Sequence, residues 1–188
     1  WGDFDVDGQT STALLVQALQ ILGADVVYYI PIRGKESHGV HIETLMPILD
    51  GGVQLVITCD TGITAHAAVD YCNSRGVDVI ITDHHELGES LPNANAIINP
   101  KLLPADHPLK NLAGVGVAYK LAEALLIENR KSEIENLLDL VALGLIADVA
   151  LLQGETRTLV QRGLQQLRQT KRPGLRVMAE LSNTQLEA

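Results

Sequence analysis

The chain has 188 residues, of which 46% are hydrophobic and 3% aromatic, and its formal net charge is -9 at pH 7. This length suits one sizeable globular domain, alone or with a small appendage, and no apolar run reaches the roughly 20 residues that cross a bilayer. The acidic balance excludes a protein that binds nucleic acid through a general coat of basic residues. A metal-dependent nuclease stays possible, because carboxylates that hold cations add to the formal negative charge.

The first half of the chain alternates helical and extended patterns. A helix is expected over 10–23, where hydroxyl residues precede apolar residues at helical spacing and a glycine ends the pattern. A strand is expected over 25–31, "DVVYYIP", and a short helix over 42–49. The polar loop 33–41 between them, "RGKESHGVH", could reach substrate phosphates, although a solvated loop is the favoured interpretation.

Further strands are expected over 53–60, 77–85 and 95–100, with a helix over 63–76. The first two are apolar throughout, which is typical of strands covered by helices on both faces. The sequence therefore predicts an α/β fold in which a parallel β-sheet is flanked by helices.

The pattern from Val115 onward is helical, with helices expected over 116–128, 132–150 and 155–169. A boundary near Leu151 would divide the chain into a sheet domain, 1–150, and a C-terminal helical extension, 151–188. Two glycines before the first of these helices, Gly114 and Gly116, could present amides to a phosphate, but a helix start or close packing explains them equally well.

Acidic and imidazole side chains gather where the predicted strands end. They are Asp3, Asp5 and Asp7 in "WGDFDVDG", Asp60 in "ITCDTG", and Asp83, His84 and His85 in "ITDHH". A further acid, Asp148, interrupts the otherwise apolar stretch "ALGLIADVALL". Ligands of open parallel sheets bind at the carboxyl ends of the strands. Clustered carboxylates repel one another unless a cation joins them, and this mixture of oxygens and imidazoles suits Mn²⁺ or Mg²⁺.

A single aspartate at a strand end is often only a helix cap, so the argument depends on the set. Asp5 and Asp7 would project the same way from an extended backbone. A bridging carboxylate could hold two ions about 3.5–4 Å apart, an arrangement that activates water and neutralises phosphoryl oxygens.

The motifs "GDFDVDG", "TCDTGI", "TDHH" and "GLIADV", in this order, resemble those of the DHH phosphoesterase superfamily. Intervening stretches such as "TSTALL" and "LAGVGVAYKLAEAL" are similar to its RecJ branch, the single-strand-specific 5′ to 3′ DNA exonucleases. The resemblance implies that Asp7, Asp60, His84 and Asp148 hold one divalent ion, and that Asp5 and Asp60 help to hold a second.

The resemblance also implies roles outside this ligand set. His85 would face the scissile phosphate as an electrophile or proton donor, while Asp83 would orient a histidine and Asp3 would support the site from behind the ligands. The sequence departs from the superfamily at Trp1, where many members have a metal-binding histidine, and at His38, where RecJ-like proteins tend to have an aromatic residue.

The leading hypothesis is a phosphodiesterase with two Mn²⁺ or Mg²⁺ ions that removes nucleotides from the 5′ end of single-stranded DNA in repair and recombination. Its partners would be single-stranded DNA and a single-strand-binding protein or helicase, without a membrane. One alternative keeps the chemistry but acts on short oligonucleotides, cyclic dinucleotides or pyrophosphate, and another is a catalytically silent binding module. Cys59 and Cys72 form no CxxC pair, which favours reduced thiols and a cytoplasmic location.

Overall fold

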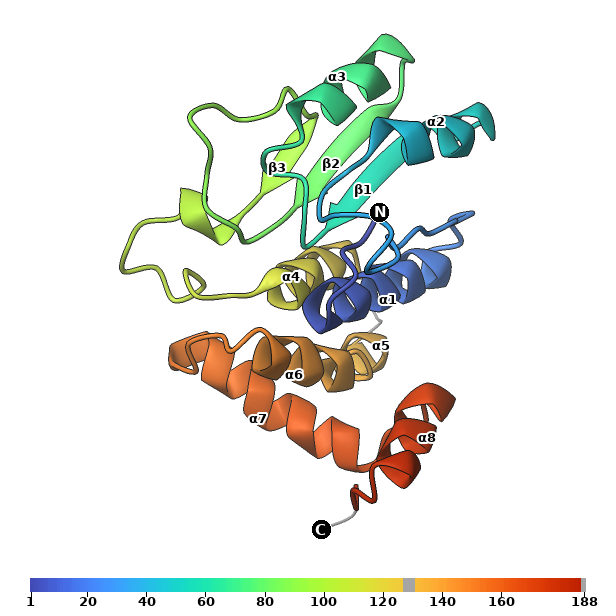
Figure 1. Cartoon of the computed structure of the whole chain (residues 1–188). Helices are drawn as coiled ribbons and strands as arrows, with labels where there is room; N and C mark the ends of the chain where they lie inside the picture. Colours follow the sequence, from blue (N-terminus) through green and yellow to red (C-terminus); the bar gives the residue numbers. More distant parts are fainter. Residues whose placement is uncertain (127–130, 187–188) are drawn as a thin grey trace.

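Three parallel strands form the sheet at the centre of the fold, in the order β1 (Leu55–Cys59), β2 (Asp78–Thr82) and β3 (Ala96–Ile98). The computed structural model describes residues 1–126 and 131–186 (Figure 1). Each predicted strand of this sheet is present but shorter than its apolar run. The expected α/β fold with a parallel sheet is therefore confirmed.

Helices cover both faces of the sheet (Figure 1). One face carries α2 (Ile42–Asp50) and α3 (His66–Ser74), and the other carries α1 (Val6–Ile21) and α4 (Gly114–Leu125). Successive strand residues pack into different hydrophobic cores, one on each face of the sheet. Val56 packs with α2 and α3, whereas the next residue, Ile57, packs against the core of α1 and α4. This explains why the strands lack polar alternation.

The remaining helices extend the α1 and α4 side of the molecule (Figure 1). They are α5 (Lys131–Glu135), α6 (Leu138–Ala147), α7 (Gly154–Arg168) and α8 (Pro173–Leu181), with a 3₁₀ turn at Pro100–Leu102 earlier in the chain. The helix expected over 132–150 is thus divided between α5 and α6, and α8 was not predicted. The predicted end of the helix over 116–128 lies outside the described residues.

Residues after Leu151 pack directly on the preceding helix α6. A Cβ atom at Gly163 of α7 would overlap the Leu138 carbonyl oxygen and lie 2.6 Å from Ala142 Cβ, so only glycine permits this close approach of α7 to α6. A domain boundary near Leu151 stays a prediction.

Two expectations for the first 31 residues are wrong. Residues 25–31 form no strand, although the Gly2 amide donates a hydrogen bond to the Tyr29 carbonyl at 2.9 Å. The first helix begins at Val6 rather than near residue 10, because the Asp5 side chain caps it by accepting a hydrogen bond from the Gly8 amide at 2.9 Å. No helix in the described ranges is both long and apolar enough to cross a membrane.

Candidate metal centre

Four elements bring the predicted site residues to one edge of the sheet. Asp60 directly follows β1, and His84 and His85 follow β2 after Asp83. The segment that leads into α1 supplies Asp3 and Asp5, the first turn of α1 supplies Asp7, and the C-cap of α6 supplies Asp148. The site therefore lies at the carboxyl ends of the strands, where open parallel sheets bind their ligands.

Asp5 and Asp7 reach this edge in a different way from the one expected. They do not alternate on an extended backbone, since Asp5 is the N-cap of α1 and Asp7 lies in its first turn. As a result they belong to different groups of potential ligands. Asp5 lies with Asp3 and Asp60, the Asp3 group, whereas Asp7 lies with His84 and Asp148, the Asp7 group.

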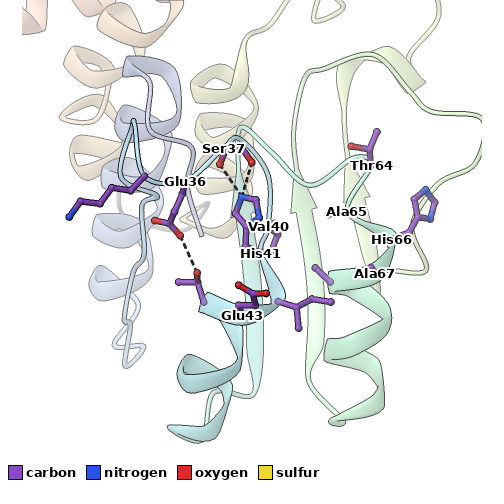
Figure 2. Close-up of a pocket in the computed structure, with 13 residues that line it drawn as sticks. Glu36, Ser37, Val40, His41, Glu43, Thr64, Ala65, His66 and Ala67 are labelled. Atoms are coloured by element: carbon purple, nitrogen blue, oxygen red, sulfur yellow. Dashed lines mark hydrogen bonds between the residues drawn. The ribbon is translucent and has the colours of Figure 1, made fainter.

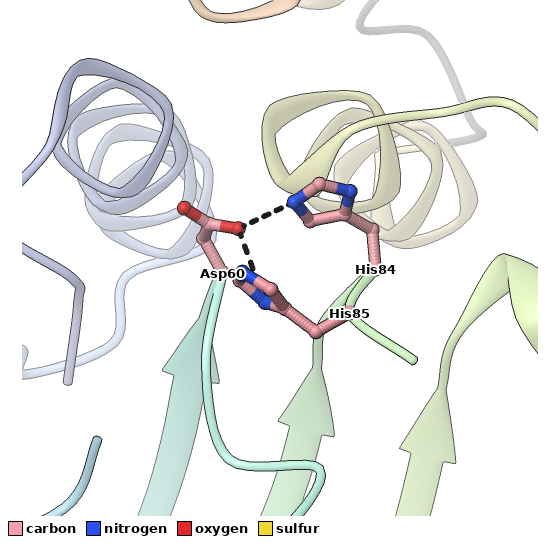
Figure 3. Close-up of side chains that lie close together, drawn as sticks. All are labelled: Asp60, His84 and His85. Carbon is pink, nitrogen blue, oxygen red and sulfur yellow. Dashed lines mark ion pairs between the residues drawn. The ribbon is translucent and has the colours of Figure 1, made fainter. Parts of the chain in front are cut away.

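A further group links these two. It consists of Asp60, His84 and His85 (Figure 3), and in each of the three groups the candidate ligand atoms lie within 4.8 Å of one another. His84 Nε2 lies 3.1 Å from Asp60 Oδ1, 3.7 Å from Asp7 Oδ2 and 3.8 Å from Asp148 Oδ1. Because Asp60 belongs to the Asp3 group and His84 to the Asp7 group, one continuous set of oxygens and imidazoles spans the edge.

Asp60 is the clearest indication that this set fits a divalent cation. Its carboxylate is buried, and neither oxygen accepts a hydrogen bond within the described part of the chain, because even the 3.1 Å approach of His84 Nε2 lacks hydrogen-bond geometry. The residue also has a left-handed backbone conformation, with φ at 63°. A buried carboxylate without a donor is unfavourable unless a cation neutralises it, and the strained backbone is typical of a functional site.

The acidic groups resist ionisation without a cation. Burial first, and then the nearby Asp60 carboxylate, raise the pKa of Asp7 to about 7. Burial first, and then Asp5, raise the pKa of Asp60 to about 8. At neutral pH these positions favour either a proton or a metal ion, which is the behaviour expected of a site built to hold a cation.

Asp7 is held by the beginning of α4. Its carboxylate oxygens accept hydrogen bonds from the Gly114 amide at 2.6 Å and the Val115 amide at 2.9 Å. A Cβ atom at Gly114 would lie 2.6 Å from Asp60 Cβ, and one at Gly144 would lie 2.8 Å from Asp7 Oδ1. The amides at this helix start therefore serve Asp7 rather than a phosphate, and the glycines let α4 and α6 approach the carboxylates closely.

The Asp83 side chain contacts the imidazole of His85. Asp83 Oδ1 lies 2.7 Å from His85 Nδ1, and its Oδ2 accepts a hydrogen bond from the Ile63 amide at 2.9 Å. Burial alone would raise the pKa of Asp83, but the hydrogen bonds from His85 and Ile63 hold it below its usual value. The same bond to Asp83 is the main cause that raises the pKa of His85 to about 9. The imidazole is half exposed, so substrate can reach it.

Sequence reasoning missed the contact between His38 and Asp3. Asp3 is 2% exposed, and its Oδ2 lies 2.5 Å from His38 Nδ1. No spacing rule connects these residues, because α1 and the loop after it separate them in the chain. The indole of Trp1 packs against Tyr29 and donates a hydrogen bond to the Gly39 carbonyl at 3.0 Å.

A pocket with a volume of about 630 Å³ opens beside the ligands. Its walls include Asp5, Asp7 and Asp148 together with Phe4 and Arg33. The Arg33 guanidinium lies over the Phe4 ring, 4.8 Å from its centroid. The pocket therefore combines an acidic edge suited to a cation with a fixed positive charge suited to a phosphate.

The chain is similar to known nucleases. The family model described as "DHH family, N-terminal domain" matches residues 1–145. The chain is 47% identical to the single-stranded-DNA-specific exonuclease RecJ of Bacillus subtilis (strain 168), over 97% of this chain and 23% of that protein. It is 42% identical to the protein of the same name from Thermus thermophilus, over 95% of this chain and 26% of the relative. The chain thus spans about a quarter of the length of these curated relatives.

Solved structures agree with this similarity. A crystal structure of exonuclease RecJ bound to manganese matches with a TM-score of 0.87 and 40% identity, over 96% of this chain and 46% of that one. A crystal structure of RecJ from Thermus thermophilus in complex with Mn²⁺ matches with a TM-score of 0.82 and 37% identity, over 98% of this chain and 26% of that one.

The raised pKa values predict how pH affects stability without metal. The pKa values of Asp7 and Asp60, about 7 and 8, exceed their ordinary value of 3.8, so between about pH 4 and 8 the folded state binds more protons than the unfolded state. Stability should therefore fall as pH rises through this window, and His85 adds the same sign between 6.5 and about 9. Thermal unfolding at about pH 5.5, 7 and 8.5 with a chelator should give falling midpoints.

Added Mn²⁺ should reverse this trend. It binds the ionised carboxylates, so its stabilising effect should grow as pH rises. A midpoint in chelator that stays constant or rises from about pH 5.5 to 8.5 would contradict the assigned pKa shifts.

Proposed function

Since this chain belongs to the DHH family, we propose that it carries the catalytic centre of an exonuclease specific for single-stranded DNA, with 5′ to 3′ polarity. The observation that carries the proposal is the buried Asp60 carboxylate, which accepts no hydrogen bond from the described residues and belongs to two of the groups of potential ligands. The exonucleases to which the chain is similar, and the manganese-bound structures it matches, support the same reading. Every acid of the motifs and both paired histidines are present, with Trp1 as the one departure, and this argues against a catalytically silent module.

The proposed centre holds two Mn²⁺ or Mg²⁺ ions. Asp7, Asp60, His84 and Asp148 would bind one ion, and Asp5 and Asp60 the other, with Asp60 as the shared ligand. The proximity of Asp3 to Asp5 and Asp60 supports its addition to the second set. When bound, such a pair lowers the pKa of a water molecule and neutralises phosphoryl oxygens.

The side chains around the ions would bind and orient the substrate. Arg33 would attract a phosphate into the pocket it shares with Asp5 and Asp148. His85, held by Asp83 and half exposed, would donate a hydrogen bond or a proton to the phosphate. Asp7 would stay fixed by the two α4 amides, so that its lone pairs keep one direction during turnover.

The wider setting of the activity is part of the same proposal. The substrate would be single-stranded DNA, presented by a single-strand-binding protein or a helicase during repair and recombination. Two buried free thiols, Cys59 and Cys72, are compatible with work in the cytoplasm.

Hydrolysis assays with Mn²⁺ test the proposal. We expect the full-length protein to release mononucleotides from 5′-labelled single-stranded DNA, with no product after chelation and little from a blunt duplex. Bacillus subtilis RecJ serves as the positive control under the same conditions. Cleavage of a dinucleotide or pyrophosphate with single-stranded DNA left intact would contradict the exonuclease and support the alternative substrates.

A further inference from the structure

His38 contacts a carboxylate of the proposed centre without being a candidate ligand itself. Its Nδ1 lies 2.5 Å from Asp3 Oδ2, while Asp3 Oδ1 accepts a hydrogen bond from the Phe4 amide at 2.8 Å. Both oxygens of this buried carboxylate therefore have a partner that fixes their direction. Asp3 in turn shares a potential cation position with Asp5 and Asp60.

The backbone of Asp3 is fixed as well. A Cβ atom at Gly8 would lie 2.6 Å from the Asp3 carbonyl oxygen, so α1 approaches this residue as closely as a glycine allows. With the backbone held, the remaining freedom of Asp3 is rotation of its side chain. The contact with His38 restricts that rotation.

The loop that carries His38 is anchored on both sides of this residue. Figure 2 shows part of this loop, with Glu36 and Ser37 before His38 and Val40 and His41 after it. Before it, the Glu36 carboxylate accepts hydrogen bonds from the Tyr29 hydroxyl at 2.6 Å and the Thr44 hydroxyl at 3.0 Å. After it, the Gly39 carbonyl accepts the bond from the Trp1 indole at 3.0 Å. His38 thus projects from a loop that is held in place, although its side chain is 66% exposed.

The ring itself is also held. Its centroid lies 4.1 Å from that of Phe4, at an interplanar angle of 45°. Ring contacts of this kind restrict the imidazole plane and so aim Nδ1 at Asp3. An N–H group at Nδ1 would moreover offset part of the repulsion between Asp3 and the two other carboxylates of its group.

We propose that His38 is a positioning residue, which holds the Asp3 carboxylate in the orientation that binds a divalent cation together with Asp5 and Asp60. The proposal rests on the proposed function only in that it requires a metal site. Hydrogen bonds to ligating carboxylates typically affect metal affinity by about 10–100-fold. His38 therefore sets the affinity of the Asp3 group for its cation.

Calorimetric titration with Mn²⁺ tests this role in two variants. His38→Phe keeps a ring against Phe4 but removes the nitrogen, and we expect the affinity of one Mn²⁺ site to fall by about 10–100-fold. His38→Asn restores an N–H donor near the position of Nδ1, and we expect an affinity close to wild type. Lys35→Ala, an exposed change in the same loop, is the matched control and should leave Mn²⁺ binding unchanged.

A double-mutant cycle separates positioning from a general structural role. If His38 acts through Asp3, then His38→Phe should have no further effect on Mn²⁺ affinity in an Asp3→Asn background. The unfolding midpoint in chelator should change little, whereas a structural role would lower it and leave metal affinity intact.

Wild-type affinity in His38→Phe, an equal loss in His38→Asn, or additive losses in the double variant would each overturn the proposal. Because these readouts are binding data, they remain distinct from the assay of function. A wild-type chain that binds Mn²⁺ but leaves single-stranded DNA intact would contradict the exonuclease and not the role of His38.

Discussion

The Asp60→Asn variant should lose hydrolysis by about 10³-fold or more and yet unfold at a higher temperature than the wild type when both are free of metal. The loss of activity follows because Asp60 is the proposed shared ligand of the cations. Such cations would stabilise the transition state by several kcal/mol, and each factor of ten in rate corresponds to about 1.4 kcal/mol. The gain in stability follows because the wild-type carboxylate is buried, accepts no hydrogen bond from the part of the chain that the structure describes, and lies near other acids.

Activity and thermal unfolding of the same preparations check both halves of this prediction. The stability difference should be largest above about pH 8, where the wild-type carboxylate is ionised in the folded state as well, since its pKa is about 8. With Mn²⁺ present, the order should reverse, because the variant loses the stabilisation that metal binding gives.

Asp70→Asn is the matched control, since it makes the same chemical change at an exposed position of α3. It should alter neither activity nor the response to metal. Hydrolysis by Asp60→Asn within about tenfold of wild type would refute the bridging assignment.

The Arg172→Met variant should unfold at a midpoint roughly 6–12 °C below that of the wild type. We expect the free energy of unfolding to fall by about 3 kcal/mol, and each kcal/mol shifts the midpoint by about 2–4 °C in a chain of this size. The Arg172 Nε atom donates to both oxygens of the buried Asp139 carboxylate, at 3.0 and 2.9 Å. Its Nη1 and Nη2 atoms bond the Gln17 side chain at 2.8 Å and the Asn136 carbonyl at 3.1 Å. Without Arg172, the buried charge of Asp139 keeps too few donors.

Differential scanning calorimetry should measure this loss. Replacing both partners, as Asp139→Leu with Arg172→Met, should recover part of it, because the remaining destabilisation comes from the uncompensated carboxylate. Arg168→Met, at an exposed position of α7, should shift the midpoint by less than about 2 °C. Equal losses in the single and double variants would show that the ion pair is not the cause.

The sheet was predictable because buried parallel strands have an apolar signature that few other elements share. Val56 and Ile57 pack into apolar cores on opposite faces of the sheet, so both positions must be apolar, and the sequence shows this as an uninterrupted apolar run. Residues 25–31 have the same apolar character but form no strand. A strand depends on pairing along its length, and the neighbouring chain turns into α1 at Val6, so this segment has little backbone to pair with.

The composition of the site was also predictable, whereas its geometry was not. Aspartate and histidine residues after buried strands predict a metal edge, and the structure brings them together. The assumption of an extended backbone at Asp5 and Asp7 failed because a capping bond between Asp5 and Gly8 starts the helix earlier. The contact of His38 with Asp3 joins a loop to a residue 35 positions earlier in the chain, and no periodicity encodes such a contact.

Because Asp7 is bonded to the start of α4, variants of Asp7 and of Asp60 should lose activity in different ways. Asp7 supplies acceptors to backbone amides more than 100 positions away, at 2.6 and 2.9 Å, and so joins the first and fourth helices. Its replacement by alanine would leave buried amides unpaired and should deplete the protein in living cells through proteolysis. Asp60 accepts no such bonds from the described residues, so a variant with asparagine there should accumulate to normal abundance, and its loss of activity would report on the metal centre rather than on protein turnover.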